Sequence, residues 1–329
     1  MQANIENMRE IFLALISQIT EYKLNETMAK HTSFLCGGEA AIYVACEDPI
    51  TTAKILYIAK LFGVPCTVLG NGSNVLFSDR GFNGLVLQLK KNSLKAEGDT
   101  LYAFAGTRLS YLSKEAKHLS LTGLEFAHGI PGSVGGAVYM NAGCYGNNIS
   151  DVLIYADCLN LNNINKANNI ANAKEQSEAI IKNKKELPIL RYSNEELKFS
   201  YRNSLVKEQN LLVLNAAFKL KPGEQDKIAN TMQEMQEKRH ASQPLEYPSA
   251  GSFFKRPHNN FAGALIEQSG LKGLRIGGAQ VSEKHAGFII NTGGATSSDV
   301  WHVAQEVQNK VYQKFQVMLE PEVEFIGFE

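Results

Sequence analysis

The sequence predicts a mixed α+β protein built from two or three domains. Strand-like and helix-like segments alternate along most of the 329 residues, and two glycine-rich segments interrupt the first half. At roughly 100–200 residues per domain, this length allows two or three domains. The composition, 44% hydrophobic and 20% charged, is typical of a globular protein with an ample core.

The N-terminal segment has the spacing of an amphipathic helix over residues 1–22. Its apolar side is formed by Ile5, Met8, Ile11, Phe12, Leu15, Ile16 and Ile19. Glu6 and Glu10 precede a short apolar run and no basic leader is present, so the pattern does not favour a signal peptide.

A strand, a helix and a second strand follow at 40–46, 50–62 and 65–70, in the order of a β-α-β unit. Further strands are predicted at 84–89, 101–106, 152–159, 211–220 and 322–326, and further helices at 108–119, 226–240, 261–269 and 297–315. The polar segment 160–184 is interpreted as a surface excursion, partly helical or disordered. Pro222 and Gly223 break the chain, and we place a domain boundary there.

Charge and cysteine usage narrow the function classes. The 33 basic and 33 acidic side chains cancel, which gives no support for binding nucleic acid through bulk charge. The five cysteines form neither a C-x-x-C pair nor a disulfide framework, as expected in a reducing cytoplasm. No apolar stretch approaches the ~18 residues of a membrane span. We expect a cytoplasmic monomer with no metal and no membrane partner.

Two glycine-rich turns, GNGSN at Gly70–Asn74 and the longer segment His128–Gly146, are candidate anion sites. Backbone N–H groups in such turns can approach and surround a pyrophosphate. The alternative is a pair of tight turns without a ligand. Val75 stands where a Rossmann fingerprint needs its third glycine, and neither turn has a Walker lysine.

Three polar groups further along are candidate catalytic residues. Ser252 lies in the glycine-flanked turn PSAGSFFK and could be a nucleophile, a proton donor or a structural residue. Tyr201 and Arg202 precede a polar turn and could equally be surface residues. A period of two would place three glutamates on one face of a strand, which could also be a solvated face: Glu320, Glu322 and Glu324.

Six motifs, in this order, resemble the UDP-N-acetylenolpyruvoylglucosamine reductase (MurB) family in its shorter, type II form. They are GNGSN, GIPGSVGGAVYMNAGCYG, YRNS, QPLEYPSAGSFFK, SGLKGLRIGGAQVSEKHAGFIIN and LEPEVEFIG. The resemblance covers roughly residues 28–329, and residues 1–27 are assigned to the N-terminal helix. It implies a two-lobed FAD-binding module of the vanillyl-alcohol-oxidase (PCMH) type at 28–222. Its lobes would cover about 28–90 and 91–222, and an α/β substrate-binding domain would cover 223–329.

The same resemblance implies non-covalent FAD, with NADPH as the co-substrate that reduces it. The FAD pyrophosphate would contact the two glycine-rich turns. The implied cofactor-binding residues are Gly70, Asn71, Gly72, Ser73, Asn74, Gly129, Ile130, Pro131, Gly132, Ser133, Gly135, Gly136 and Ala137.

The family reaction reduces UDP-N-acetylglucosamine-enolpyruvate to UDP-N-acetylmuramate, in peptidoglycan-precursor synthesis. The resemblance assigns the substrate carboxylate to Arg202 and Glu322, and the proton to Ser252. It assigns substrate contacts to Tyr201, Lys255 and His285.

Two positions depart from the family pattern, since Arg256 and His31 each replace an asparagine. His31 is interpreted as a helix-capping substitution. The alternatives are another FAD-dependent oxidoreductase on the same module, or a non-catalytic flavin-binding protein.

Overall fold

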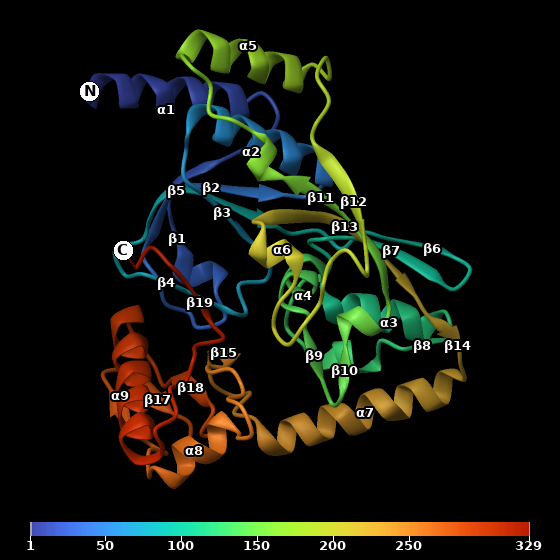
Figure 1. Ribbon diagram of the computed structural model, residues 1–329, viewed down its shortest axis with the longest axis vertical. Coiled ribbons are helices and arrows are strands. Elements are labelled where there is room, and N and C mark those ends of the chain that lie inside the picture. The colour runs from blue at the N-terminus through green and yellow to red at the C-terminus, as the bar shows by residue number, and fades with distance from the viewer. Residues whose placement is uncertain (1, 329) are drawn as a thin grey trace. The chain divides into compact units, whose positions relative to one another are not determined.

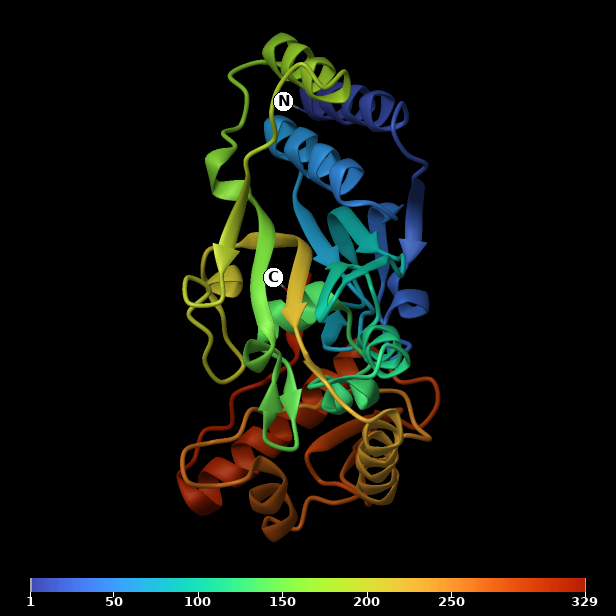
Figure 2. The same cartoon turned by 90° about the vertical axis from the view of Figure 1, so that its right-hand side faces the viewer.

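The computed structural model describes residues 2–328, with side chains from Asn7 onward, and forms two compact units (Figures 1 and 2). Unit 1 comprises Met1–Leu24, Ala41–Asn71 and Gly84–Gln233. Unit 2 comprises Asn25–Ala40, Gly72–Asn83 and Glu234–Glu329. The side chain of Ile5 lies outside the described part. The helix α7, Gln225–Ser242, begins just after the predicted boundary at 222–223, and the two units divide within this helix. The predicted domain limits remain predictions.

Two sheets form the frame of the first two-thirds of the chain. One has the order β1-β2-β5-β3, from Lys23–Thr27, Glu39–Cys46, Phe82–Leu89 and Cys66–Leu69. The predicted strand–helix–strand succession is confirmed, but β3 pairs in parallel with β5 and not with β2. The other sheet has the order β12-β11-β13-β7-β6, from Ile189–Ser193, Leu153–Asn160, Leu211–Lys219, Thr100–Phe104 and Leu94–Glu97. It is antiparallel throughout.

Three helices of unit 1 pack against one another: α1 (Gln2–Ile16), α2 (Pro49–Phe62) and α5 (Ile170–Ile181). The predicted helix α2 is confirmed, and its ends carry the expected signals. The Asp48 side chain accepts the Thr51 N–H at 2.8 Å, and Gly63 closes the helix with φ 65°. The N-terminal helix ends at Ile16 and not at residue 22, because single turns follow and Lys23 then enters strand β1.

The polar segment 160–184 contains an ordered helix. Ala173, Ser177 and Ile180 of α5 are buried, although most of their neighbours are polar. Lys54 of α2 donates to the Ile181 carbonyl at 3.1 Å, which ties the end of α5 to α2. Three small or apolar side chains on one face are therefore enough to order this segment against its neighbours.

The remaining helices of unit 1 flank its glycine-rich segment. α3 (Leu109–His118) confirms the predicted helix at 108–119, and α4 (Val134–Met140) lies inside the segment. A short helix, α6 (Leu205–Glu208), precedes β13. Two small strands, β9 (Gly143–Cys144) and β10 (Asn147–Asn148), form a hairpin after α4.

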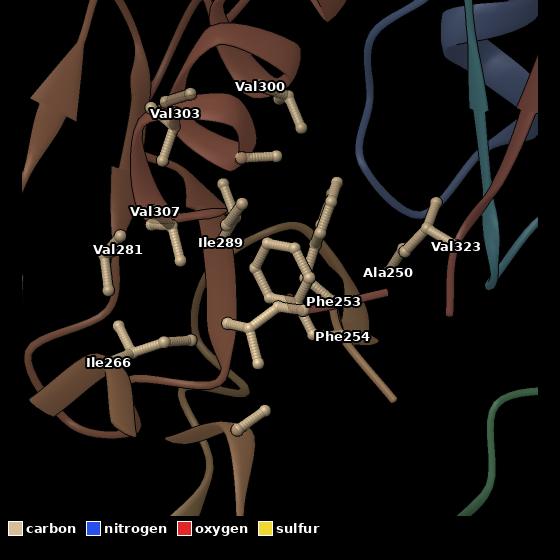
Figure 3. Close-up of a cluster of buried hydrophobic side chains, with 14 of the residues drawn as sticks. Ala250, Phe253, Phe254, Ile266, Val281, Ile289, Val300, Val303, Val307 and Val323 are labelled. Atoms are coloured by element: carbon tan, nitrogen blue, oxygen red, sulfur yellow. The ribbon is translucent and has the colours of Figure 1, made fainter. Parts of the chain in front are cut away.

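Unit 2 is built on a four-stranded antiparallel sheet in the order β15-β18-β17-β16. These strands are Ser249–Ser252, Phe288–Asn291, Ala279–Val281 and Arg275–Ile276. The helices α8 (Ala262–Gln268) and α9 (Ser297–Phe315) confirm the two predicted helices of this region. Figure 3 shows Val300, Val303 and Val307 of α9 in one core with Phe253 and Ile289. Their spacing of three and four residues is the helical pattern read from the sequence.

The C-terminal strand is shorter than predicted. β19 covers only Glu324–Ile326 and pairs in parallel with β4, Val75–Phe77. Glu320 and Glu322 precede it and instead bond to the segment after Ser252. The expectation that all three glutamates share one strand face is therefore wrong, because a second segment captures the backbone around Pro321.

The N-terminus of α9 is closed by Asp79, which is 218 residues away in sequence. The carboxylate accepts the N–H groups of Ser297 and Ser298, both at 2.8 Å, and the Ser298 hydroxyl at 2.6 Å. Burial raises the pKa of Asp79, but these hydrogen bonds outweigh burial and leave the pKa below its usual value. A negative charge at this end of a helix is stabilising.

We expect Asp79→Asn to lower the free energy of unfolding by about 1 kcal/mol, as for a lost helix cap. A lowered pKa means that the stabilisation is present above the unfolded pKa and is lost as pH falls through the folded pKa. The difference between wild type and variant should therefore shrink in acid. Urea unfolding at several pH values measures it. Glu175→Gln, which removes an exposed charge from α5, is the control, and equal unfolding midpoints for Asp79→Asn and wild type at neutral pH would contradict the prediction.

Burial raises the pKa of the Cys36 thiol to about 11 and those of Cys46 and Cys158 to about 12. All five cysteines are free thiols.

Within residues 2–328, no helix combines the length and the apolar character needed to cross a bilayer.

Candidate functional site

The first glycine-rich turn follows β3 and is held in place by two linked hydrogen bonds from buried side chains. The Tyr43 hydroxyl donates to the Gln88 side-chain oxygen at 2.7 Å, and the Gln88 amide donates to the Gly70 carbonyl at 2.8 Å. Buried polar groups with satisfied partners rigidify their surroundings. The start of the turn therefore has a fixed direction.

In the second glycine-rich segment, several backbone N–H groups already donate hydrogen bonds within the protein. Ser133 caps α4 by accepting the Gly136 N–H at 3.3 Å. The N–H groups of Val134, Gly135 and Ala137 donate to the carbonyls of Thr107, Ala105 and Ser133. These four amides already have partners, so a phosphate would meet the earlier part of the segment, at Gly132 and Ser133.

The structure brings the two glycine-rich segments together within unit 1. The Asn71 side-chain amide donates to the Pro131 carbonyl at 3.1 Å. A Cβ atom at Gly70 would lie 2.2 Å from Ser133 Oγ, whereas one at Gly132 would meet only side-chain carbons at 3.6 Å and beyond. Glycine at position 70 thus permits the close approach of the two turns, whereas position 132 has room for a Cβ atom. This cradle fits a pyrophosphate held by backbone N–H groups.

The second half of the first turn belongs to unit 2, where Gly72 packs against the chain before β2. Gly72 has φ 64°, and a Cβ atom there would lie 2.0 Å from the His31 carbonyl oxygen. The Ser33 N–H donates to the Gly72 carbonyl at 2.9 Å. The His31 ring hydrogen-bonds to Glu26 at 2.9 Å. Its side chain therefore pairs with a carboxylate, in place of the predicted capping of a helix end.

Ser252 ends strand β15 just after an irregularity in its pairing with β18. Ser249 pairs with Ile290 and Ser252 with Phe288, so two residues face one on the partner strand. Gly251, within this bulge, has φ 77°. Bulges redirect a side chain. The Ser252 side chain is exposed, and its hydroxyl makes no hydrogen bond within residues 2–328.

Glu322 lies beside the segment that follows Ser252. Its N–H donates to the Phe253 carbonyl at 2.8 Å, and the Lys255 N–H donates to the Glu320 carbonyl at 2.8 Å. Phe253 itself is fully buried in the core of Figure 3. The structure therefore brings Ser252 and Glu322 onto adjacent, paired segments of unit 2, anchored by a buried aromatic side chain.

Arg202 and Tyr201 lie in unit 1, in a loop fastened to the glycine-rich segment. Arg202 has φ 55°, donates to the Gly143 carbonyl at 3.4 Å, and has its guanidinium 5.1 Å from the Tyr201 ring centre. The Ser204 hydroxyl donates to the Tyr139 carbonyl at 2.8 Å. Arg202 is thus held by the region after α4. Its approach to Ser252 and Glu322 remains a prediction.

Asn141 is a residue of this region that sequence reasoning missed. It ends α4 with φ 44°, donates to the Ser200 carbonyl at 3.2 Å and accepts the Ser150 N–H at 3.1 Å. It fixes the loop that carries Arg202. Asparagine tolerates the left-handed conformation, and its place between apolar residues and a glycine was the available signal.

The remaining predicted substrate contacts lie in unit 2. Lys255 pairs with Glu320 at 3.2 Å, and the Arg256 guanidinium stacks on the Phe261 ring at 4.3 Å. His285 accepts the Gly287 N–H on Nδ1 at 3.1 Å, and burial lowers its pKa. His285 is therefore neutral at pH 7 and carries its proton on Nε2.

The fold and the family models that match it define an FAD-dependent oxidoreductase. The model of an FAD-binding domain matches residues 40–163, and the model of the C-terminal domain of UDP-N-acetylenolpyruvoylglucosamine reductase matches residues 243–326. The predicted α+β flavin module and the predicted FAD cofactor are confirmed.

Whole-length relatives give the family. The chain is 44% identical over 94% of its length to the UDP-N-acetylenolpyruvoylglucosamine reductase of Latilactobacillus sakei, covering 95% of that protein. It is also 44% identical to the Clostridium novyi enzyme of that name, over 94% of this chain and 93% of the relative. The crystal structure of the Thermus caldophilus enzyme superimposes with a TM-score of 0.72 and 32% identity, over 93% of this chain and 98% of that one. The chain belongs to the UDP-N-acetylenolpyruvoylglucosamine reductase (MurB) family, whose members are FAD-dependent enzymes of peptidoglycan-precursor synthesis.

Proposed function

We propose that this protein reduces UDP-N-acetylglucosamine-enolpyruvate to UDP-N-acetylmuramate with NADPH, as a cytoplasmic monomer. The observation that supports it best is the Ser252 hydroxyl, which is exposed, has no partner within residues 2–328, and adjoins the segment paired with Glu322. An exposed hydroxyl that makes no hydrogen bond and lies next to a β-bulge is well placed to contact a ligand.

The two glycine-rich turns would hold FAD, which would supply hydride chemistry. The hydride would originate from NADPH and go to the terminal carbon of the enolpyruvyl double bond. The electron pair of that double bond moves to the neighbouring carbon and into its carboxylate. Such developing charge needs preorganised partners. Arg202 places a cation beside the carboxylate, and protonated Glu322 donates a hydrogen bond to it.

Ser252 then gives its hydroxyl proton to the carbon beside the carboxylate. This completes the reduced product, and the serine oxygen regains a proton from solvent. The acceptor is carbanion-like and strongly basic, so a weak acid is a sufficient donor. The serine acts as an acid and forms no covalent bond to the substrate.

The remaining contacts are assigned to binding. In the second glycine-rich segment, the FAD pyrophosphate is assigned to the backbone at Gly132 and Ser133. The N–H groups of residues 134–137 already donate to other groups of the protein. Tyr201 and Lys255 contact the substrate. His285 contributes as a neutral donor through Nε2–H, since Nδ1 accepts from Gly287.

The test is a two-step reaction with the purified protein. The flavin absorbance should bleach with NADPH in the absence of oxygen and recover on addition of the enolpyruvyl nucleotide. Recovery with oxygen alone would favour another FAD-dependent oxidoreductase on the same module. A protein that binds FAD without bleaching would be a non-catalytic flavin binder. Light scattering during chromatography tests the monomer.

Glu322→Gln is expected to slow recovery of the flavin absorbance at least about tenfold, while bleaching by NADPH stays near normal. The amide can still donate to the carboxylate, but it donates from a nitrogen and with altered geometry. Stopped-flow absorbance separates the two steps. Glu320→Gln is the comparison variant. It removes a carboxylate two residues away, which forms an exposed ion pair with Lys255. Full recovery rates in Glu322→Gln would remove Glu322 from the site.

A further inference from the structure

The two asparagines of the Gly70–Asn74 turn hold different partners. Asn71 donates its side-chain amide to the Pro131 carbonyl of the second glycine-rich segment, at 3.1 Å. Asn74 donates its side-chain amide to the Glu322 carbonyl, also at 3.1 Å and across 248 residues of sequence. One turn therefore connects both to the pyrophosphate cradle and to the segment with the catalytic carboxyl group.

The main chain at Glu322 is fixed on both sides. Its N–H donates to the Phe253 carbonyl at 2.8 Å, and its carbonyl accepts from Asn74. Two residues on, the Glu324 N–H donates to the Asn74 carbonyl at 3.0 Å. Asn74 thus bonds on either side of Val323 through its own side chain and main chain.

These bonds extend a short parallel ladder. Val75 begins β4 and pairs with Glu324, which begins β19, so no strand hydrogen bond reaches back to Glu322. The Asn74 side-chain amide takes the place of the missing backbone donor. An asparagine amide can mimic a backbone group in this way.

We propose that Asn74 is a positioning residue for Glu322 and acts on the second half of the reaction. Its amide fixes the Glu322 main chain, and with it the direction of the carboxyl group, against the anchored Phe253. Asn74 was assigned to FAD from the sequence, but its side-chain donor points to the protein main chain. The inference rests on the proposed role of Glu322.

The test compares Asn74→Ala with Glu322→Gln and with the double variant. Asn74→Ala should slow recovery of the flavin absorbance by about tenfold, with bleaching by NADPH and the Kd for FAD changed less than about threefold. If Asn74 acts through Glu322, the two losses are not additive, and the double variant should be little slower than Glu322→Gln alone. If Asn74 had only a structural role, its loss would slow both bleaching and recovery, and its effect on recovery would add to that of Glu322→Gln.

Asn162→Ala is the matched control, because it also removes a side-chain donor to a carbonyl, that of Gln209 at 2.7 Å. It should leave both steps unchanged. Asn71→Ala should instead raise the Kd for FAD. Asn74→Asp keeps the shape and removes the donor, so it serves if the alanine variant does not fold, and the same slow recovery is expected.

A normal recovery rate in Asn74→Ala or Asn74→Asp, or additive losses in the double variant, would overturn the inference. So would a loss of FAD affinity with an unchanged recovery step. If the wild-type flavin does not recover with the enolpyruvyl nucleotide, the proposed function fails and this inference with it. A normal wild-type reaction with an unaffected Asn74 variant rejects the inference alone.

Discussion

Replacing Ser252 with alanine is expected to slow recovery of the flavin absorbance by the enolpyruvyl nucleotide by about 10²–10⁴-fold. This is the range for removing a positioned proton donor. Bleaching by NADPH should stay near normal, because that step needs no proton from Ser252. The Ser252 hydroxyl makes no hydrogen bond within residues 2–328, so its removal should change the free energy of unfolding by less than about 0.5 kcal/mol.

Ser249→Ala, in the same strand β15, is the matched control and should leave both steps intact. Ser252→Cys tests whether a different proton donor restores part of the rate. Single-turnover measurements of bleaching and recovery separate the steps. Unchanged rates in both steps for Ser252→Ala would remove the serine from the mechanism, and a loss in both would point to a defect in FAD binding.

Replacing Gly72 with alanine is expected to lower the free energy of unfolding by about 2–5 kcal/mol and to empty the protein of flavin. Two costs combine. The residue has φ 64°, where a side chain is strained, and its Cβ atom would lie 2.0 Å from the His31 carbonyl oxygen. Because the obstacle is backbone, the turn itself must shift, and Asn71 and Asn74 would lose their geometry.

Gly98→Ala separates the two costs. Gly98 has φ 60°, and a Cβ atom there meets nothing within 4 Å, so only the backbone strain of about 1–2 kcal/mol remains. Denaturant unfolding gives the stabilities, and the ratio of flavin to protein absorbance gives the FAD content. Equal stability of the two variants, with full flavin in Gly72→Ala, would contradict the role of the close approach.

The sequence predicted the regular elements best where periodicity or end signals were strong. The helix at 297–315 has the predicted bounds, with valines at helical spacing on the core face and a capping box at Thr296 and Asp299. For the segment 160–184 the sequence left open a partly helical or a disordered chain, and the helix α5 confirms the first. The sequence could not decide between them, because the burial of Ala173, Ser177 and Ile180 depends on helices α1 and α2. It also joined Glu320, Glu322 and Glu324 into one strand, because local alternation does not reveal which segment captures the backbone.

The candidate site was predicted unevenly for the same reason. Residue types and turn composition point to two glycine-rich turns and to a serine in a glycine-flanked turn, and comparison with the family pattern singles out Arg256 and His31. The partners of those residues cannot be predicted in this way. The pairing of His31 with Glu26 and the support of the Arg202 loop by Asn141 are side-chain contacts that no spacing encodes.

By itself the sequence determined the α+β composition, the two turns able to approach a phosphate and the family to which the chain belongs. Those properties follow from local backbone preferences and from ordered motifs. Only the tertiary structure decided that Asn71 serves one glycine segment and Asn74 serves Glu322, that residues 134–137 spend their amides on the fold, and that Ser252 keeps its hydroxyl uncommitted within residues 2–328. The physical reason is that these hydrogen bonds join residues 60 or 248 positions apart. Which distant segments become neighbours depends on the tertiary fold, and local sequence patterns do not specify it.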